Sequence, residues 1–103
     1  MNQTDIDGKT PLYIACEKGY IEIVKLLLND RRVDINKAEN DAKTPFWIAC
    51  ERGNIEIVKL LLNDKGISIK KKIHGKNAFD IARTNNHSEV MKLIKELDTG
   101  NSY

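Results

Sequence analysis

The sequence lacks the features that would point to a membrane protein or a nucleic-acid-binding protein. No apolar run approaches the roughly 20 residues that a membrane span needs. The first ten residues are polar, so we expect no secretory signal. The formal net charge is only +2, too small to argue by itself for nucleic acid or an anionic membrane. We therefore expect an intracellular chain, cytoplasmic or nuclear, with neither nucleic acid nor membrane as a partner.

Motifs of catalysis and metal binding are also missing. The sequence has no glycine-rich phosphate loop, no His-x-x-x-His and no Cys-x-x-Cys. His74 and His87 have no second ligand at metal spacing, so we interpret both as surface residues. We predict that the chain is not an enzyme and needs no metal or other cofactor.

What the sequence does have is internal repetition. Residues 7–40 and 41–74 are identical at 21 of 34 aligned positions. A diverged third copy follows at a step of 33, in which Ala82 aligns with Ala49 and Leu93 with Leu60. A fixed period in the low thirties is typical of stacked repeat proteins, and three repeats are near the minimum for a stable stack. We expect a single domain over 1–103, with repeats at about 7–40, 41–73 and 74–97 and a frayed tail at 98–103.

Each of the first two copies predicts two short helices and an extended connector. In the first copy, Thr10-Pro11 begins a helix, because threonine caps well and proline suits the first helical position. This helix should run to Lys18, and Gly19 should end it in a left-handed conformation. A second helix is expected over 21–28, followed by a connector over 29–40. The second copy repeats this pattern, with its second helix at 55–62.

The third copy differs in a way that suggests the end of the stack. Asn77 and Asn86 replace the capping threonine and the turn glycine, and both are acceptable substitutes. Arg83, Ser88 and Lys95, however, replace residues that are apolar in both earlier copies. We interpret these three as the surface that would face a following repeat, here turned to water, so that 74–97 forms a C-terminal cap.

No comparable change protects the first copy. Leu12, Ile14, Ile23 and Leu26 match residues that should meet a preceding repeat in the later copies. The short lead-in at 1–6 would cover them poorly. An upstream repeat, a second copy of the chain or a partner could each cover this surface.

The combined pattern resembles the ankyrin repeat. The motifs that carry the likeness are Thr-Pro-Leu-x-x-Ala, a glycine turn, Ile-Glu-Ile-Val-Lys-Leu-Leu-Leu and an Asp-x-Asn connector, over Gly8–Asn36, Thr44–Ile69 and Gly75–Leu97. The nearest likeness is to ankyrin proteins of protozoa. The resemblance implies an all-α helical repeat solenoid, a stack of helix–turn–helix repeats with hairpin-like loops. It also implies a non-enzymatic protein–protein interaction module that binds through its loop tips and concave helix face.

One departure from the family pattern concerns the histidine that usually follows Thr-Pro-Leu and bonds back to the threonine. Tyr13, Trp47 and Asp80 stand at this position, so that bond is not expected in its usual form. Aromatic residues are enriched at binding hot spots, so Tyr13 and Trp47 either contact a partner or pack beside the threonine turn.

The cysteines occupy equivalent positions in the first two repeats. Packed helices lie about 10 Å apart, whereas the Cα atoms of a disulfide lie within roughly 4.4–6.8 Å. We therefore expect Cys16 and Cys50 to be reduced, buried thiols in a reducing compartment.

Residues that packing does not need should lie at the loop tips and on the exposed side of each first helix. There they form a ladder of acidic and basic groups that could set the choice of partner. The partner-binding candidates are Ile6, Asp7, Lys9, Tyr13, Glu17 and Lys18, then Asn40, Asp41, Lys43, Trp47, Glu51 and Arg52, then Ile73, His74, Lys76, Thr84 and Asn85.

Two alternatives to this interpretation stay open. The ladder could be an ordinary solvated face. The basic cluster at 70–72 could likewise be a solvated loop, or it could bind an acidic partner or phosphate. The chain could also be a structural or assembly segment, part of a larger ankyrin stack or self-associating through its first repeat.

Overall fold

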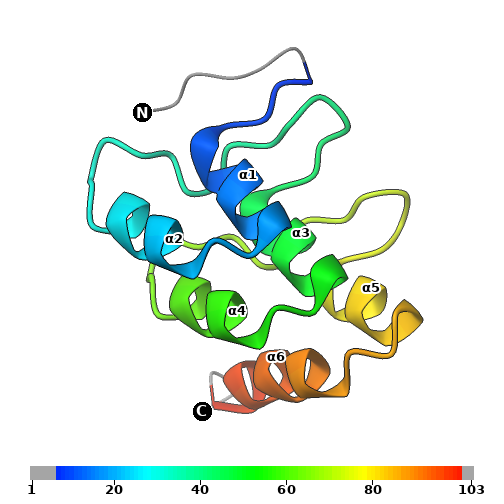
Figure 1. The fold of residues 1–103 in the computed structure, drawn as a ribbon. Coiled ribbons are helices and arrows are strands. Elements are labelled where there is room, and N and C mark those ends of the chain that lie inside the picture. Colours follow the sequence, from blue (N-terminus) through cyan, green and yellow to red (C-terminus); the bar gives the residue numbers. More distant parts are fainter. Residues whose placement is uncertain (1–6, 101–103) are drawn as a thin grey trace.

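The computed structural model describes residues 7–100 and shows three pairs of antiparallel helices (Figure 1). The pairs are α1 (Pro11–Lys18) with α2 (Ile21–Leu28), α3 (Pro45–Arg52) with α4 (Ile55–Leu62), and α5 (Ala78–Thr84) with α6 (Ser88–Gly100). Within the described residues there is no strand, and the isolated bridge between Ile73 and Lys76 closes a loop tip. The expected all-α repeat stack is confirmed.

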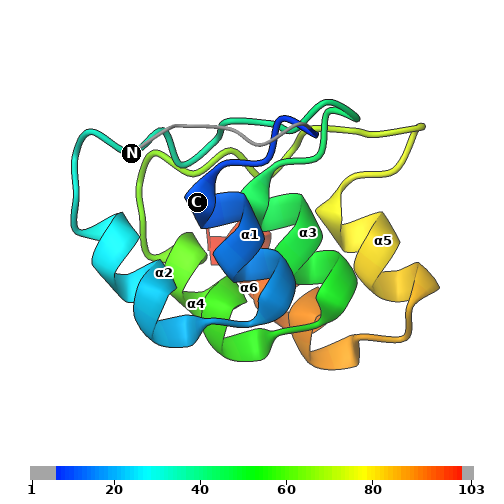
Figure 2. The same ribbon diagram turned by 45° about the horizontal axis from the view of Figure 1, so that its top comes forward.

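The six helices form two layers. Helices α1, α3 and α5 lie side by side in one layer, and α2, α4 and α6 form the other (Figures 1 and 2). The connectors project together beyond one end of the α1, α3 and α5 layer (Figure 2). Because each pair contacts mainly its neighbouring pairs, equivalent residues of successive repeats recur along one surface.

Side-chain caps begin the helices of the first layer, as the sequence predicts. The hydroxyl oxygens of Thr10 and Thr44 accept hydrogen bonds from the backbone N–H groups of Tyr13 and Trp47, at 3.2 and 3.1 Å. In α5, Asn77 Oδ1 accepts from the Asp80 N–H at 2.9 Å, and Asp80 Oδ2 accepts from the Asn77 N–H at 3.1 Å. Asp80 thus bonds back to the capping residue where the family would use histidine.

The turns between paired helices are also as predicted. Gly19, Gly53 and Asn86 have φ values of 77°, 71° and 62°, in the left-handed region. Glycine adopts this conformation without steric cost, and asparagine tolerates it better than most residues. The local sequence therefore suffices to reverse the chain three times at equivalent places.

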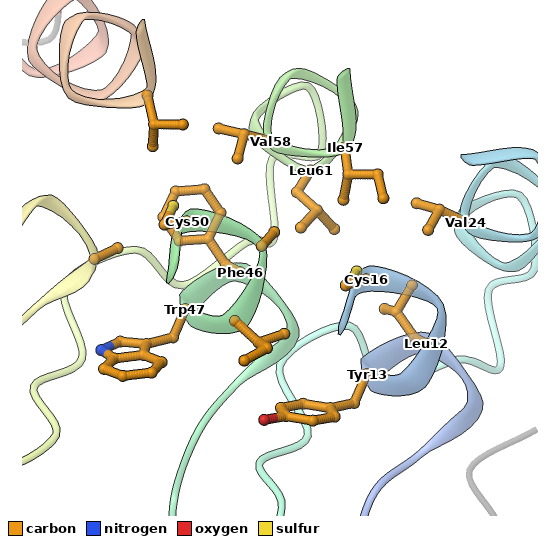
Figure 3. Packing of buried hydrophobic residues seen from close by; sticks show 14 of the residues in the cluster. Leu12, Tyr13, Cys16, Val24, Phe46, Trp47, Cys50, Ile57, Val58 and Leu61 are labelled. Atoms are coloured by element: carbon orange, nitrogen blue, oxygen red, sulfur yellow. The ribbon is translucent and has the colours of Figure 1, made fainter. Parts of the chain in front are cut away.

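The hydrophobic core fills the space between the two layers (Figure 3). In Figure 3, Leu12 and Cys16 extend from α1 towards Val24 of α2, while Phe46 and Cys50 extend from α3 towards α4. Both cysteines are free thiols and fully buried, as expected. Burial raises the pKa of the Cys16 thiol to about 12 and also raises the pKa of Cys50.

The two ends of the stack differ in polarity. At the far end Arg83, Ser88 and Lys95 are exposed, as the cap interpretation predicts. At the first repeat, Ile23 and Leu26 are 45% and 70% exposed, which agrees with the expected uncovered surface. The prediction was wrong for Leu12, which is fully buried because it points between α1 and α2. Ile14 is only half-buried, whereas its equivalent Ile48 in the second repeat is fully buried, so for Ile14 the difference agrees with the expected uncovered surface.

Two further expectations need correction. His87 is not a plain surface residue: it is half-buried, and its Nε2 lies 2.9 Å from the Glu51 carbonyl oxygen at the end of α3. The tail begins later than expected, because α6 continues to Gly100. The lead-in at 1–6 and the last residues, 101–103, lie outside the described part of the chain.

None of the helices that the structure describes is both long enough and apolar enough to cross a membrane.

Candidate functional site

Three loop tips lie at the same end of the first-layer helices, at 7–9, 39–43 and 73–76 (Figure 2). In the third tip, the Ile73 and Lys76 backbones exchange hydrogen bonds of 2.8 and 3.0 Å. The two residues between them, His74 and Gly75, have φ values of 53° and 79°. A two-residue turn with both φ values positive is a tight type I′ hairpin turn, so this tip has a defined shape.

The middle loop tip is organised by a carboxylate that the sequence analysis missed. Glu39 is only 8% exposed. Its Oε1 accepts hydrogen bonds from the Asp41 and Lys43 backbone N–H groups, both at 2.9 Å. The Asn40 N–H in turn donates to the Asp7 carbonyl at 2.9 Å, which joins the first two tips. No motif in the sequence marks this role of Glu39.

Two buried aromatic residues lie beneath the loop tips. Tyr13 and Trp47 project from α1 and α3 on the side away from α4 (Figure 3). The Lys43 ammonium lies 5.2 Å from the centre of the Trp47 ring, and the Lys9 ammonium lies 5.8 Å from that of Tyr13. The Trp47 Nε1–H donates to the Lys76 carbonyl at 3.3 Å. The aromatic rings are therefore fixed parts of the fold, and only a small part of each is exposed.

The tips and the first-layer helices enclose two adjoining hollows. The first hollow has a volume of about 290 Å³ and lies between repeats one and two; its lining is Asp7, Lys9, Tyr13, Glu17, Glu39, Asn40, Asp41 and Lys43. The second hollow has a volume of about 450 Å³ and lies between repeats two and three; its lining is Asp41, Lys43, Trp47, Glu51, Ile73, His74, Lys76 and Ile81.

The hollows share Asp41 and Lys43 and so form one groove along the loop tips. The first hollow is almost entirely polar. The second has an apolar floor of Trp47, Ile73 and Ile81, all of them buried. A groove that combines apolar floor residues with a few convergent polar groups has the usual composition of a binding site.

Equivalent carboxylates have different surroundings in successive repeats. Glu17 is held by two cations, with Lys9 Nζ at 3.3 Å and Arg52 Nη2 of the next repeat at 3.6 Å. Glu51 is the equivalent residue in repeat two, but within the described part of the chain its carboxylate has no hydrogen bond or ion pair. Lys43, which corresponds to Lys9, lies over the Trp47 ring instead.

Carboxylates surround the Tyr13 hydroxyl beside the first hollow. Burial raises the pKa of the Tyr13 hydroxyl well above its usual range, and the carboxylates of Glu39, Glu17 and Glu51 raise it further. Arg52 acts in the opposite direction, with a smaller effect than any of these. The carboxylates around Tyr13 therefore favour a positively charged group of a binding partner.

Most of the predicted site residues line this groove, and a few do not. Lys18 is exposed outside both hollows, and Asn85 donates to the Ile81 carbonyl at 3.1 Å. Thr84 accepts a hydrogen bond from Lys76 Nζ at 3.3 Å beside the second hollow. Ile6 lies outside the described residues. The sequence analysis missed Ile81 as well as Glu39, because Ile81 has the spacing of an ordinary core residue.

The structure contains no group of three or more histidine, cysteine or acidic side chains that could hold a metal ion, as far as residues 7–100 are described. The groove has carboxylates, ammonium groups and apolar surface, which suit recognition. We find in it no arrangement of a nucleophile with an adjacent base.

Comparison with known proteins gives the family. A search of curated proteins found no match. The family model for ankyrin repeats in three copies matches residues 31–102, and the model for a single ankyrin repeat matches residues 7–40. Together the two matches extend over nearly all of the residues that form the helix pairs. The chain belongs to the ankyrin repeat family.

Proposed function

We propose that this chain is a non-enzymatic protein-binding module that holds a partner protein in the groove along its loop tips. Ankyrin repeats are generally protein–protein interaction modules and typically non-enzymatic. The observation that carries the proposal is the groove itself, two adjoining hollows of about 290 and 450 Å³ over a rigid floor. We further propose that residues 1–103 act as one domain inside the cell, which the two free, buried cysteines support.

Rigidity of the groove favours this function. The loop tips are closed by backbone hydrogen bonds and by Glu39, so little conformational freedom is lost when a partner binds. A standard interface buries about 800 Å² per partner. With principal dimensions of 35 × 27 × 21 Å, the molecule as a whole has faces of about that size.

Affinity capture from a lysate of the source cells tests the proposal. The groove variant would carry Asp41→Lys, Glu51→Lys and Lys43→Glu. The control variant would carry Glu22→Lys, Glu56→Lys and Lys59→Glu, which changes the net charge equally on exposed positions of α2 and α4. Circular dichroism melts would first show that both variants fold.

We expect the wild type and the control variant to retain the same protein and the groove variant to lose it. Retention of the same set of proteins by all three would show that the groove is not the binding surface, and the proposal would then be abandoned.

A second candidate function is assembly through the first repeat. Tyr20, Ile23 and Leu26 are 49%, 45% and 70% exposed on one face of α2. Their equivalents in the second repeat, Asn54, Ile57 and Leu60, face the preceding repeat, and Ile57 is fully buried there. The exposed face of α2 therefore has the shape and composition of a surface that receives another repeat unit.

Light scattering over a range of concentrations tests whether the chain uses this face to self-associate. Assembly predicts a concentration-dependent larger species that disappears on Leu26→Lys and persists on Lys59→Glu. Leu12→Lys is unsuitable here, since Leu12 is a core residue whose replacement would unfold the chain. A monomer at every concentration would count against self-association.

A further inference from the structure

The second hollow contains the carboxylate of Glu51, which forms no ion pair within the described part of the chain. In repeat one, Glu17 receives Lys9 from its own loop tip and Arg52 from the following repeat. The residues in these places around Glu51 are Lys43 and Asn85. Lys43 covers the Trp47 ring, and Asn85 is neutral and donates to the Ile81 carbonyl at 3.1 Å. Neither forms with Glu51 the ion pair that its counterpart forms with Glu17.

The remaining basic groups of the second hollow keep their charge but form no ion pair with Glu51 within the described part of the chain. Lys76 Nζ donates to Thr84 Oγ1 at 3.3 Å, and the His74 side chain is exposed at the loop tip. A second carboxylate, Asp41, lies on the ridge shared with the first hollow. Across the whole groove, the lining holds five carboxylates and three lysines: Asp7, Glu17, Glu39, Asp41 and Glu51 against Lys9, Lys43 and Lys76.

The acidic balance of the groove contrasts with the chain as a whole, whose formal net charge is +2. Three of these carboxylates, Glu39, Glu17 and Glu51, also act on the Tyr13 hydroxyl, whose pKa is raised first by burial and then by their charges. Charge complementarity sets which partner binds and in which register. An acidic partner would therefore meet repulsion where a basic one is attracted.

The floor of the second hollow sets a second requirement. Trp47, Ile73 and Ile81 are buried, and together they form an apolar patch beneath Glu51 and Asp41. The second hollow has a volume of about 450 Å³, which is larger than a single ammonium or guanidinium group would fill. An apolar side chain beside the basic one would cover the floor and remove water from the charged contact.

We propose that the second hollow binds an extended segment of a partner protein in which an arginine or lysine pairs with Glu51 and Asp41 while a neighbouring apolar side chain packs on Trp47, Ile73 and Ile81. This inference rests on the proposed function, and it narrows the partner to one with a basic and apolar segment.

The only tryptophan of the chain makes the test direct, because Trp47 lines the hollow and its fluorescence reports occupancy. Three synthetic ten-residue peptides would be titrated into the full chain. The first alternates arginine and leucine, the second alternates glutamate and leucine, and the third alternates arginine and glycine. Each titration would be repeated with Glu51→Gln and with the control Glu56→Gln, which removes an exposed charge from α4.

We expect the arginine–leucine peptide to change the Trp47 emission with saturation and the glutamate–leucine peptide to leave it unchanged. Glu51→Gln should weaken its binding about fivefold, the upper range for a partly exposed ion pair, and added salt should weaken binding to the wild type. Glu56→Gln should leave the affinity unchanged. The arginine–glycine peptide should bind more weakly than the arginine–leucine peptide, because it leaves the floor uncovered.

Equal or tighter binding of the glutamate–leucine peptide would overturn the inference, as would no binding of the arginine–leucine peptide or an unchanged affinity in Glu51→Gln. These failures are distinct from failure of the proposed function. If the wild type captures a protein that the groove variant described above does not capture, the groove binds a partner of other chemistry. If both capture the same proteins, the groove itself is not the binding surface.

Discussion

Ala42 adopts a backbone conformation that its side chain disfavours. Its φ is 70°, and Gly8 and Gly75, at the equivalent places in the other repeats, both have φ values of 79°. The left-handed conformation costs a residue with a Cβ atom about 1–2 kcal/mol. The hydrogen bonds that Glu39 makes across this tip hold the loop in place around Ala42.

Ala42→Gly should stabilise the fold. Relief of the strain exceeds the extra entropy that glycine loses on folding, so we expect a gain of roughly 0.5–1 kcal/mol in the free energy of unfolding. Urea denaturation would measure it. Ala49→Gly, inside α3, is the matched control and should instead lose about 1 kcal/mol or more. A destabilised Ala42→Gly would show that the loop is not strained.

Gly53→Val should have the opposite effect. Gly53 has a φ of 71°, and a Cβ atom there would collide with the His87 ring. We expect a loss of more than about 1 kcal/mol, whereas Lys18→Ala, on an exposed site, should stay within about 0.5 kcal/mol. Thermal unfolding would compare the two variants, and equal midpoints would contradict the assigned turn.

The contrast between these residues shows what sequence can predict at this scale. Gly19, Gly53 and Asn86 follow from local rules, because a helix end that needs a left-handed residue selects glycine or asparagine. Ala42 and His87 do not follow from them. The first is held by the middle loop, and the second contacts the end of α3 from another repeat. Both effects depend on tertiary contacts that no local pattern encodes.

Among the larger elements, the connectors are joined across repeats by a single side chain. Asn36 Nδ2 donates to the Gly66 carbonyl at 2.8 Å, and Asn36 Oδ1 accepts from the Ser68 N–H at 2.8 Å. These two hydrogen bonds place the connector that follows α2 beside the one that follows α4. The connectors have no ladder of backbone hydrogen bonds to do this.

Asn36→Ala should therefore cost more than an ordinary surface substitution. It removes two exposed hydrogen bonds, and water then solvates the backbone donor and acceptor, so we expect a loss of about 1 kcal/mol in the free energy of unfolding. Asn63→Ala, on an exposed residue after α4, should stay within about 0.5 kcal/mol. Hydrogen exchange at the Ser68 amide gives a local check, and unchanged protection in Asn36→Ala would contradict the role given to Asn36.

At the level of elements, sequence predicted the first four helices well and the groove incompletely. The helix bounds follow from Thr-Pro starts and glycine turns, which act within a few residues. The predicted end of α6 was too early. Residues 95–98, Lys-Glu-Leu-Asp, contain no helix breaker, and the helix accordingly continues to Gly100. The two hollows arise from loop tips of neighbouring repeats, so their shape and their shared ridge could not be derived from one repeat alone.

The molecule as a whole should be sensitive to alkaline pH through its two buried thiols. Burial raises the pKa of Cys16 to about 12 and that of Cys50 further above its ordinary value. A free cysteine thiol has a pKa of roughly 8.5, so as pH rises the unfolded chain releases these protons at a lower pH than the folded chain does. The stabilisation is therefore complete below about pH 8 and is lost progressively above it.

Between pH 8 and pH 10 the loss should be on the order of 3 kcal/mol for the two thiols together. Urea denaturation at both pH values would measure it, with a Cys16→Ala and Cys50→Ala double variant as the control. The double variant should be less stable at pH 8 but nearly insensitive over this range. A fall of equal size in both proteins would assign the alkaline loss to other groups.

The polarity of the two ends gives the stack a direction. One end exposes Ile23 and Leu26, and the other exposes Arg83, Ser88 and Lys95. A protein engineer who fused an additional consensus repeat ahead of α1 would find a surface ready to receive it. The same repeat fused after α6 would meet charged groups and would first need those three positions restored to apolar residues. Without further substitutions, the stack can therefore be lengthened only at the end formed by the first repeat.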